Sequence, residues 1–191
     1  MRNILISIKP EWVEKILNGE KIIEIRKSIP KCELPCKVYI YCTKGNKELR
    51  LFNQKVCASL KIPRAKTYSK AQQKAYTKFI GDESQSLNGK VVAEFTLNKV
   101  EEFKVFENGS VQYWNCFSLE KSCLKYDDIA LYIGCDKTGY AWYIDDLKIY
   151  DKPKELSEFS SIIKRMKGKE SRFTSHLLQR PPQSWCYVEG E

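Results

Sequence analysis

Apolar and polar positions along the first quarter of the chain predict a strand, a helix and two further strands in that order. Residues 3–8 form a short apolar run of strand length. Pro10 suits the first turn of a helix and Gly19 suits its C′ position. Between them, apolar residues recur at helical spacing: Trp12, Val13, Ile16 and Leu17. Residues 21–27 and 38–43 alternate with the period of a strand.

Residues 47–88 lack this alternation and predict a helical insertion. Ser69 and Gln72 have the spacing of a capping box, and Gly81 suits a helix stop. Residues 61–79 contain six basic residues and no acidic one. This composition indicates contact with an anionic partner, and the alternative is a solvated outer face. The lysines proposed to contact a nucleic-acid backbone recur every four residues, on one helix face: Lys66, Lys70, Lys74 and Lys78.

The second half of the chain returns to short strands. Strands are expected at 90–97, 139–145, 147–150 and 184–188, and an apolar, buried run at 129–133. Residues 155–180 predict a helix followed by a basic, weakly structured segment. In this segment, the residues expected to contact a nucleic-acid backbone are Lys164, Arg165 and Lys167. The whole pattern predicts one α+β domain over residues 1–191, with a small mixed or antiparallel β-barrel, flanking helices, the helical insertion and an extension from about residue 155.

Composition narrows the classes of function. Apolar residues make up 42% of the chain, which supports a sizeable core. The net charge of +9 favours a nucleic-acid partner first and an anionic membrane surface second. No stretch has the length of a signal peptide or a membrane span, so we expect a cytoplasmic protein without membrane contact, with reduced cysteines. No CxxC pair occurs and His176 is the single histidine, so neither a metal nor a cofactor is expected.

The stretch GEKIIEIR, residues 19–26, contains the pattern G-x-K-x-x-E-x-R. Lys21 and Arg26 can donate to phosphate, and Glu24 can pair with either or accept from a base amino group. Strict alternation places Glu24 and Arg26 on one face of the strand and Lys21 on the other, unless the entry turn carries Lys21 across. The alternative is a Glu24–Arg26 ion pair that only braces the sheet.

This motif, following a strand and a helix, resembles the ASCH family of the PUA-like superfamily. The similarity covers residues 1–44 and 89–150, and the ending Arg180–Trp185 is similar to that of prophage-type members. The resemblance implies binding of RNA or of a modified nucleotide in a groove. Some members of the family resemble ribonucleases, and others hydrolyse an acylated cytidine with the motif lysine. In an enzyme of this kind Lys21 and Glu24 would be catalytic, although the amidohydrolases typically have threonine where this chain has Glu24.

Aromatic residues are the second group of candidate ligand contacts, because nucleobases stack on such side chains. They add four residues to Lys21, Glu24 and Arg26: Tyr39, Tyr41, Trp142 and Tyr143. The leading hypothesis is an RNA-binding or nucleotide-binding module. The alternatives are a metal-independent ribonuclease or nucleoside amidohydrolase, and a phage-linked module that binds a protein partner. The sequence does not indicate an oligomeric state.

Overall fold

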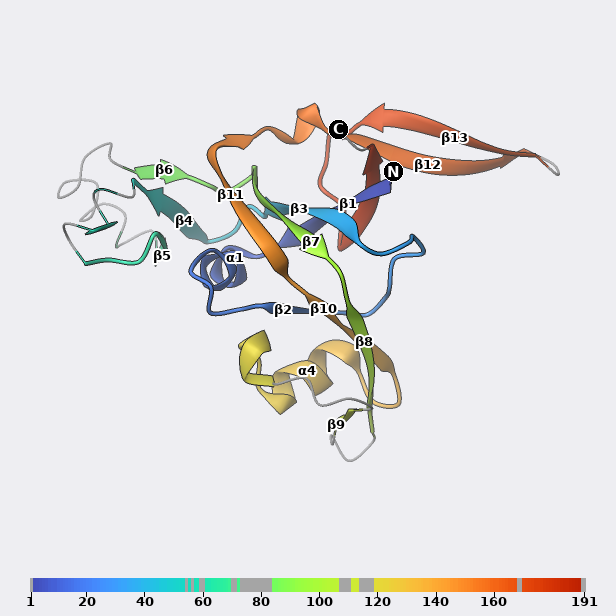
Figure 1. The fold of residues 1–191 in the computed structure, drawn as a ribbon, viewed down its shortest axis with the longest axis horizontal. Helices are drawn as coiled ribbons and strands as arrows, with labels where there is room; N and C mark the ends of the chain where they lie inside the picture. The colour runs from blue at the N-terminus through green and yellow to red at the C-terminus, as the bar shows by residue number, and fades with distance from the viewer. Residues whose placement is uncertain are drawn as a thin grey trace.

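Three β-sheets, helix α1 (Pro10–Leu17) and helix α4 (Tyr126–Ile133) make up most of the described chain (Figure 1). The computed structural model describes residues 2–53, 55, 57, 58, 61–69, 72, 84–106, 111–113, 119–167 and 170–189; within residues 111–113, 163–167 and 170–172 the description is of the backbone. None of the helices in these ranges combines the length and the hydrophobicity needed to cross a membrane.

The largest sheet has seven strands in the order β11-β7-β3-β1-β14-β12-β13. The strands β1 and β3 are parallel, with Ile4 opposite Val38, and the other pairs are antiparallel. Their bounds are β1 (Arg2–Ile8), β3 (Cys36–Cys42), β7 (Val91–Leu97), β11 (Asp145–Lys154), β12 (Ser160–Lys167), β13 (Glu170–Leu177) and β14 (Trp185–Glu189).

The second sheet has four strands in the order β2-β10-β8-β9, namely β2 (Ile23–Arg26), β10 (Thr138–Tyr143), β8 (Val100–Val105) and β9 (Val111–Tyr113). It is continuous with the first sheet, because β7 leads into β8 and β10 into β11 after only one or two residues. Figure 1 shows both paths passing from the large sheet toward α4. The short strand β2 lies at the edge of this sheet and is held by β10, with Glu24 opposite Trp142.

Both faces of the central strands are buried, as expected for near-continuous apolar runs. Ile4, Val38 and Ile40 contribute to one cluster, together with residues of α1. Leu5 and Tyr39 contribute to a second cluster on the other face. A third cluster fills the space between β2, β10 and α4, where Ile23, Ile25, Ala141, Ile129 and Ile133 are buried. The apolar run at 129–133 is therefore amphipathic and helical, and its Leu131 is 89% exposed.

The predicted mixed α+β, strand-rich fold is confirmed in its coarse form. A closed barrel is not seen among the described strands, since the order of the largest sheet runs from β11 to β13 without returning to its start. The expected capping box is present as well. The Ser69 amide donates to Gln72 Oε1 at 2.9 Å, and the Gln72 amide donates to Ser69 Oγ at 3.4 Å.

Within residues 47–88, the described positions 55, 57, 58 and 72 are helical. The prediction of a helical insertion is wrong for the remaining, strand-forming part. This part contains a three-stranded sheet of β4 (Lys47–Phe52), β5 (Ala65–Ser69) and β6 (Ser84–Ser86). Within β4, Leu49 and Leu51 are buried and alternate with partly exposed neighbours, which is a strand period. The sheet is tied to α1, because Asn18 donates to the Ala65 carbonyl at 2.9 Å and accepts from the Ala65 amide at 3.1 Å.

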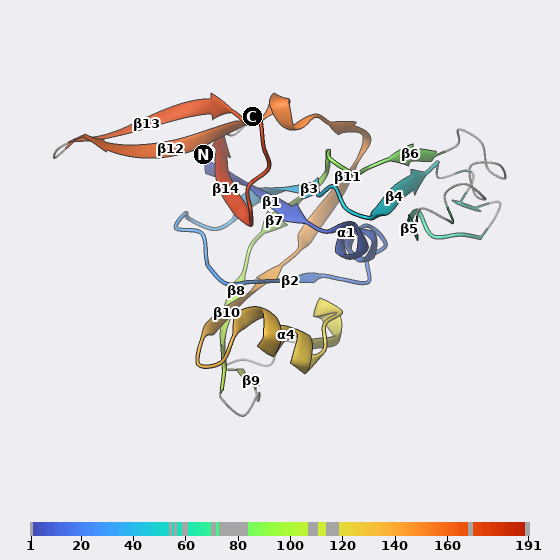
Figure 2. The same cartoon turned by 180° about the vertical axis from the view of Figure 1, so that it is seen from behind.

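The predicted helix after residue 155 is also wrong. A single 3-10 turn, η2 (Leu156–Glu158), is followed by the antiparallel hairpin of β12 and β13, which projects from the rest of the molecule in Figures 1 and 2. Leu156 and Phe159 are buried against the large sheet and fix the start of the hairpin. The β-branched and aromatic residues of this segment, such as Ile162 and Phe173, favour a strand over a helix.

Candidate functional site

The turn after α1 determines where Lys21 lies. Gly19 has φ +76°, and its amide donates to the Ile16 carbonyl at 3.0 Å, while the Glu20 amide donates to the Lys15 carbonyl at 2.9 Å. These two bonds form a Schellman motif, which ends a helix and reverses the chain direction. The Lys21 amide also donates to the Lys15 carbonyl, at 3.1 Å. Regular strand pairing begins only at Ile23, so the side chain of Lys21 is not bound by strand alternation.

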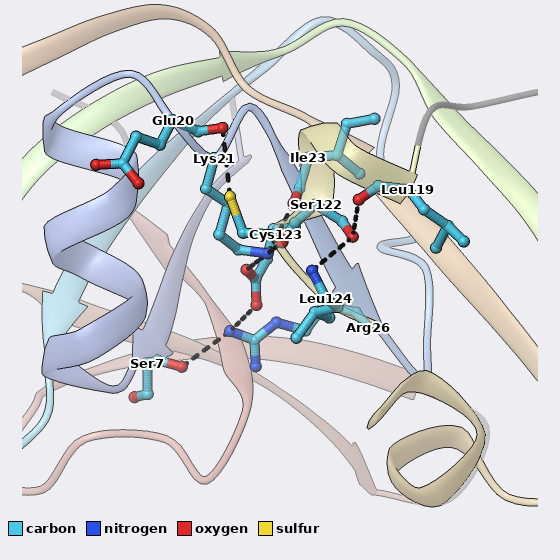
Figure 3. A network of polar contacts seen from close by, with 10 residues as sticks. Ser7, Glu20, Lys21, Ile23, Arg26, Leu119, Ser122, Cys123 and Leu124 are labelled. Atoms are coloured by element: carbon cyan, nitrogen blue, oxygen red, sulfur yellow. Dashed lines mark hydrogen bonds and ion pairs between the residues drawn. The ribbon is translucent and has the colours of Figure 1, made fainter. Parts of the chain in front are cut away.

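The ammonium of Lys21 is buried at the entrance to β2 and is held by two hydrogen bonds and one ion pair. It donates to the carbonyl of Ile23 at 2.8 Å and to the carbonyl of Ser122 in η1 (Leu119–Ser122) at 2.7 Å. Its third partner is Glu24 Oε2, at 3.2 Å. Figure 3 shows this side chain running from the strand entry toward Ile23 and Ser122. Lys21 therefore reaches the Glu24 face.

Glu24 joins the two cations of the motif. Its Oε1 lies 3.0 Å from Arg26 Nη2, and its Oε2 pairs with Lys21. All three residues are buried, so the carboxylate compensates much of the desolvation of both cations. One carboxylate faces two cations, which leaves one positive charge in this buried group. We call Lys21, Glu24 and Arg26 the motif network.

Arg26 is the member of the motif network with unused donors. Its Nη2 donates to the Ser7 carbonyl at 2.9 Å, and its Nη1 donates to Ser184 Oγ at 3.3 Å. Its Nε is buried and has no acceptor among the described residues. A buried donor without an acceptor marks a place where a water or a ligand oxygen is expected. Figure 3 shows the guanidinium reaching past β2 toward Ser7.

A cavity of about 820 Å³ opens over the motif network, and we call it the β2 cavity. Figures 1 and 2 both place β2 between α1 and α4, and residues of both helices line the cavity. Trp12 lines it from α1, and Tyr132 and Asp128 line it from α4. The end of β1 and the segment before β14 close another side with Ser7, Ile8 and residues 181–184. The volume is in the range of small-molecule sites, roughly 300–1,000 Å³.

The wall formed by residues 181–184 is fixed to the N-terminal strand. Ser7 Oγ donates to the Pro182 carbonyl at 2.7 Å, and the Ser7 amide donates to the Ser184 carbonyl at 2.9 Å. Trp185 Nε1 donates to Ser28 Oγ at 3.0 Å, just after β2. The segment Arg180–Trp185, which resembles the ending of prophage-type ASCH proteins, thus lies beside β2.

The aromatic residues predicted to contact a ligand lie outside the β2 cavity. Tyr39 and Tyr41 share a face, as alternation predicts, but they are buried in the cluster on the far face of the large sheet. Burial also raises the pKa of the Tyr41 phenol. Trp142 is fully buried in the first cluster beside Trp185, with 5.9 Å between ring centroids. None of these side chains lines the β2 cavity.

Tyr143 belongs to a different polar group. Its hydroxyl donates to Glu101 Oε2 at 2.5 Å, and Lys99 Nζ lies 2.6 Å from Glu101 Oε1. Burial and the bond to Glu101 together raise the pKa of Tyr143 to about 12. We call Lys99, Glu101 and Tyr143 the β8 network.

The aromatic residues that do line the cavity, Trp12 and Tyr132, were missed. Trp12 was assigned to the apolar stripe of the first helix, and Tyr132 to a buried run. Lys21 Nζ lies 5.5 Å from the Trp12 ring centroid, and Lys27 Nζ lies 4.9 Å from that of Tyr132. Both rings therefore face cations, a feature that follows from the tertiary fold and has no local signal in the sequence.

The residues predicted to contact a nucleic-acid backbone are only partly described by the structure. Lys66 lies in β5 with an exposed side chain, opposite Arg50 in β4, and not on a helix. Lys164, Arg165 and Lys167 lie in β12, where the backbone is described. The remaining residues of this prediction lie outside the described residues: Lys70, Lys74 and Lys78. Within the described ranges, no group of three or more His, Cys, Asp or Glu side chains is arranged to hold a metal ion.

Comparison with known proteins places this geometry in a known fold. No family model matches the chain, and no curated protein matches it. Among solved structures, the crystal structure of ASCH from Zymomonas mobilis aligns with a TM-score of 0.54 and 16% identity, covering 98% of this chain and 87% of that one. A serine-to-alanine variant of the same Zymomonas mobilis protein aligns with the same TM-score and identity, covering 98% and 88%.

The chain has an ASCH-like fold. The fold predicted from the motif and its context is thereby confirmed, whereas the prophage-type assignment stays a prediction. At 16% identity the similarity is evidence for the fold alone. The role of the motif network is therefore inferred from its own contacts.

Proposed function

We propose that this protein binds RNA, or a nucleotide unit of it, in the β2 cavity. The observation that carries the proposal is Arg26, which lines the cavity and whose buried Nε has no acceptor among the described residues. Arginine donates in a planar fork that matches phosphate, and such charge-assisted bonds are the stronger ones. The positive charge left over in the motif network adds to this preference for an anion.

The walls of the cavity fit the other parts of a nucleotide. Trp12 and Tyr132 offer aromatic faces from two different helices, and stacking on such a face stabilises a bound base by roughly 1–3 kcal/mol. Asp128 also lines the cavity, and a carboxylate can accept from a base amino group. The ASCH-like fold supports the same class of ligand, since the family resemblance implies RNA binding.

The contacts of Lys21 favour binding over catalysis. Its ammonium already donates to two backbone carbonyls and forms an ion pair with Glu24, and both oxygens of Glu24 already face a cation. A nucleophile or general base needs a free lone pair within reach of the substrate. We therefore assign Lys21 and Glu24 to holding Arg26 in place. The hydrolase and protein-partner alternatives stay predictions.

Calorimetric titration with the four nucleoside 5′-monophosphates and with a mixed-sequence single-stranded RNA tests the proposal. We expect the Tyr132→Ala variant to bind RNA about 10-fold more weakly than the unaltered protein, because one stacking face is lost. Tyr126→Ala is the matched control, since Tyr126 is on the same helix, is exposed and does not line the cavity. It should change the affinity less than twofold.

The salt dependence adds a second criterion. Binding to phosphate releases counterions, so affinity for RNA should fall steeply between low and moderate salt. Absence of binding to every probe, or equal losses in the Tyr132 and Tyr126 variants, would overturn the proposal.

A further inference from the structure

Three hollows of the surface meet at one residue, Thr43. The β2 cavity is the first. A second hollow of about 760 Å³ lies between the end of β3, η2 and residues 177–181. A third, of about 310 Å³, lies between the start of α1 and residues 43–47. Thr43 lines all three, immediately after β3 ends.

Each pair of hollows also shares a second residue. Pro181 lines both the β2 cavity and the second hollow. Lys9 lines both the β2 cavity and the third hollow, and Lys44 lines both the second and the third. The three hollows are therefore neighbouring parts of one surface, and two of the three boundaries between them carry a lysine.

The cations along this surface are available to a ligand. Lys9, Lys44, Lys47 and Arg180 line the hollows with exposed side chains, and none of them forms an ion pair with a residue that the structure describes. The carboxylate in the second hollow, Glu155, lies 3.4 Å from Lys90. In the third hollow, the carboxylate of Glu11 partly offsets the three lysines Lys9, Lys44 and Lys47.

The distribution of these cations over three adjoining hollows favours a polymer over a single nucleotide. In a single-stranded chain, each base or sugar occupies a hollow while a phosphodiester lies at the step from one unit to the next. Lysines at the boundaries between hollows stand where those phosphates would pass. A mononucleotide in the β2 cavity would contact Arg26. It would not reach Arg180 or Lys47, which line only the second and the third hollow, respectively.

We propose that the three hollows bind consecutive nucleotides of one single-stranded RNA, with one unit in the β2 cavity and the neighbouring phosphates at Lys9, Lys44 and Arg180. This inference rests on the proposed function and names its substrate as a strand of at least three nucleotides. Binding along a basic, base-accepting surface of this kind is typical of proteins that hold single strands.

Calorimetry with one nucleoside 5′-monophosphate and the RNA tetranucleotide of the same base tests the inference. We expect the tetranucleotide to bind at least about 10-fold more tightly, because it reaches cations beyond the β2 cavity. The Lys44→Ala/Arg180→Ala double variant should lose about 10-fold in affinity for the tetranucleotide and less than twofold for the monophosphate. Lys148→Ala/Lys152→Ala removes the same charge from exposed positions of β11 outside the hollows and should change neither.

The outcomes separate the two proposals. If the monophosphate binds but the tetranucleotide gains nothing, or if the double variant weakens both probes equally, the multi-nucleotide surface is wrong and the proposed function stands. If neither probe binds, the proposed function itself fails. Equal binding of a DNA tetranucleotide would overturn the assignment to RNA. Should the double variant fold poorly, Lys47→Ala tests the third hollow independently by the same pair of affinities.

Discussion

The motif network and the β8 network are built from the same parts and have different consequences. Each centres on a buried carboxylate in a strand that pairs with β10: Glu24 in β2 and Glu101 in β8. Each has a lysine close to an aromatic ring, since Lys21 Nζ lies 5.5 Å from the Trp12 centroid and Lys99 Nζ lies 4.9 Å from that of Tyr143.

The partners of the two carboxylates make the difference. Glu101 binds a neutral hydroxyl and a lysine whose side chain is 58% exposed, so its group carries no surplus charge and opens onto no hollow described above. Glu24 binds two buried cations, so its group keeps a positive charge and unused donors beneath a cavity. A buried ion pair alone is thus a poor indicator of a site. A net charge of one sign in a buried group that lines a cavity is a better indicator of a binding site.

The largest expected effect comes from removing the charge of each carboxylate in turn. Glu24→Gln should lower the free energy of unfolding by about 3–5 kcal/mol, because two buried cations lose their counterion. Glu101→Gln should lower it by only about 1–2 kcal/mol, since Lys99 can turn to solvent and Tyr143 can still donate to the amide oxygen. Urea unfolding of both variants measures the two values. Equal losses would show that the two networks do not differ in the way described.

A smaller effect is expected from filling space in the two regions. A Cβ on Gly139, in β10, would lie 2.3 Å from the Phe103 ring of β8, so Gly139→Ala should destabilise the protein by about 1–3 kcal/mol through overpacking. A Cβ on Gly19 meets nothing within 4 Å, so Gly19→Ala should cost only the strain of its positive φ, roughly 1 kcal/mol. Thermal unfolding compares them. The reverse order would mean that the turn before Lys21 tolerates less change than the packing around β10.

The smallest effect is the pH dependence of the β8 network. Burial acts to raise the pKa of Glu101, but the bonds from Lys99 and Tyr143 outweigh it and lower the pKa below the usual value of a glutamate. A lowered folded-state pKa contributes stability above the unfolded-state value, and this contribution is lost as pH falls through the folded-state value. The stability difference between the unaltered protein and Glu101→Gln should therefore shrink below pH 4.5. Urea midpoints between pH 3 and 6 provide the measurement, and a constant difference would contradict the assignment.

The sequence predicted the mixed α+β, strand-rich fold in its coarse form and part of the site. Period-two alternation correctly placed Glu24 and Arg26 together, and the end of the first helix was correctly assigned to Gly19. The sequence left open whether Lys21 lies on the same face as Glu24, because strand alternation does not apply within a Schellman turn. In the structure, Lys21 forms an ion pair with Glu24. The turn geometry depends on hydrogen bonds that a polar and apolar pattern does not encode.

The walls of the cavity were beyond prediction for a different reason. Trp12, Tyr132 and Ser184 come from segments far apart in the chain, and no local pattern relates them. The two errors in secondary structure have a common cause, because charged residues in β4 and in the β12–β13 hairpin obscured the strand period. The Leu49 and Leu51 alternation was present but short.

The bonds around Arg26 have a consequence for synthesis on the ribosome. Its guanidinium is held by Ser7 from the first strand and by Ser184 just before the last, two positions separated by most of the chain. Ser7 is likewise bonded to Pro182. Because domains emerge from their N-terminus during translation, β2 is made long before its last wall. Arg26 and Ser7 can complete these bonds only after residues 182–184 have been synthesised, so the β2 cavity is expected to form much later than β2 itself emerges.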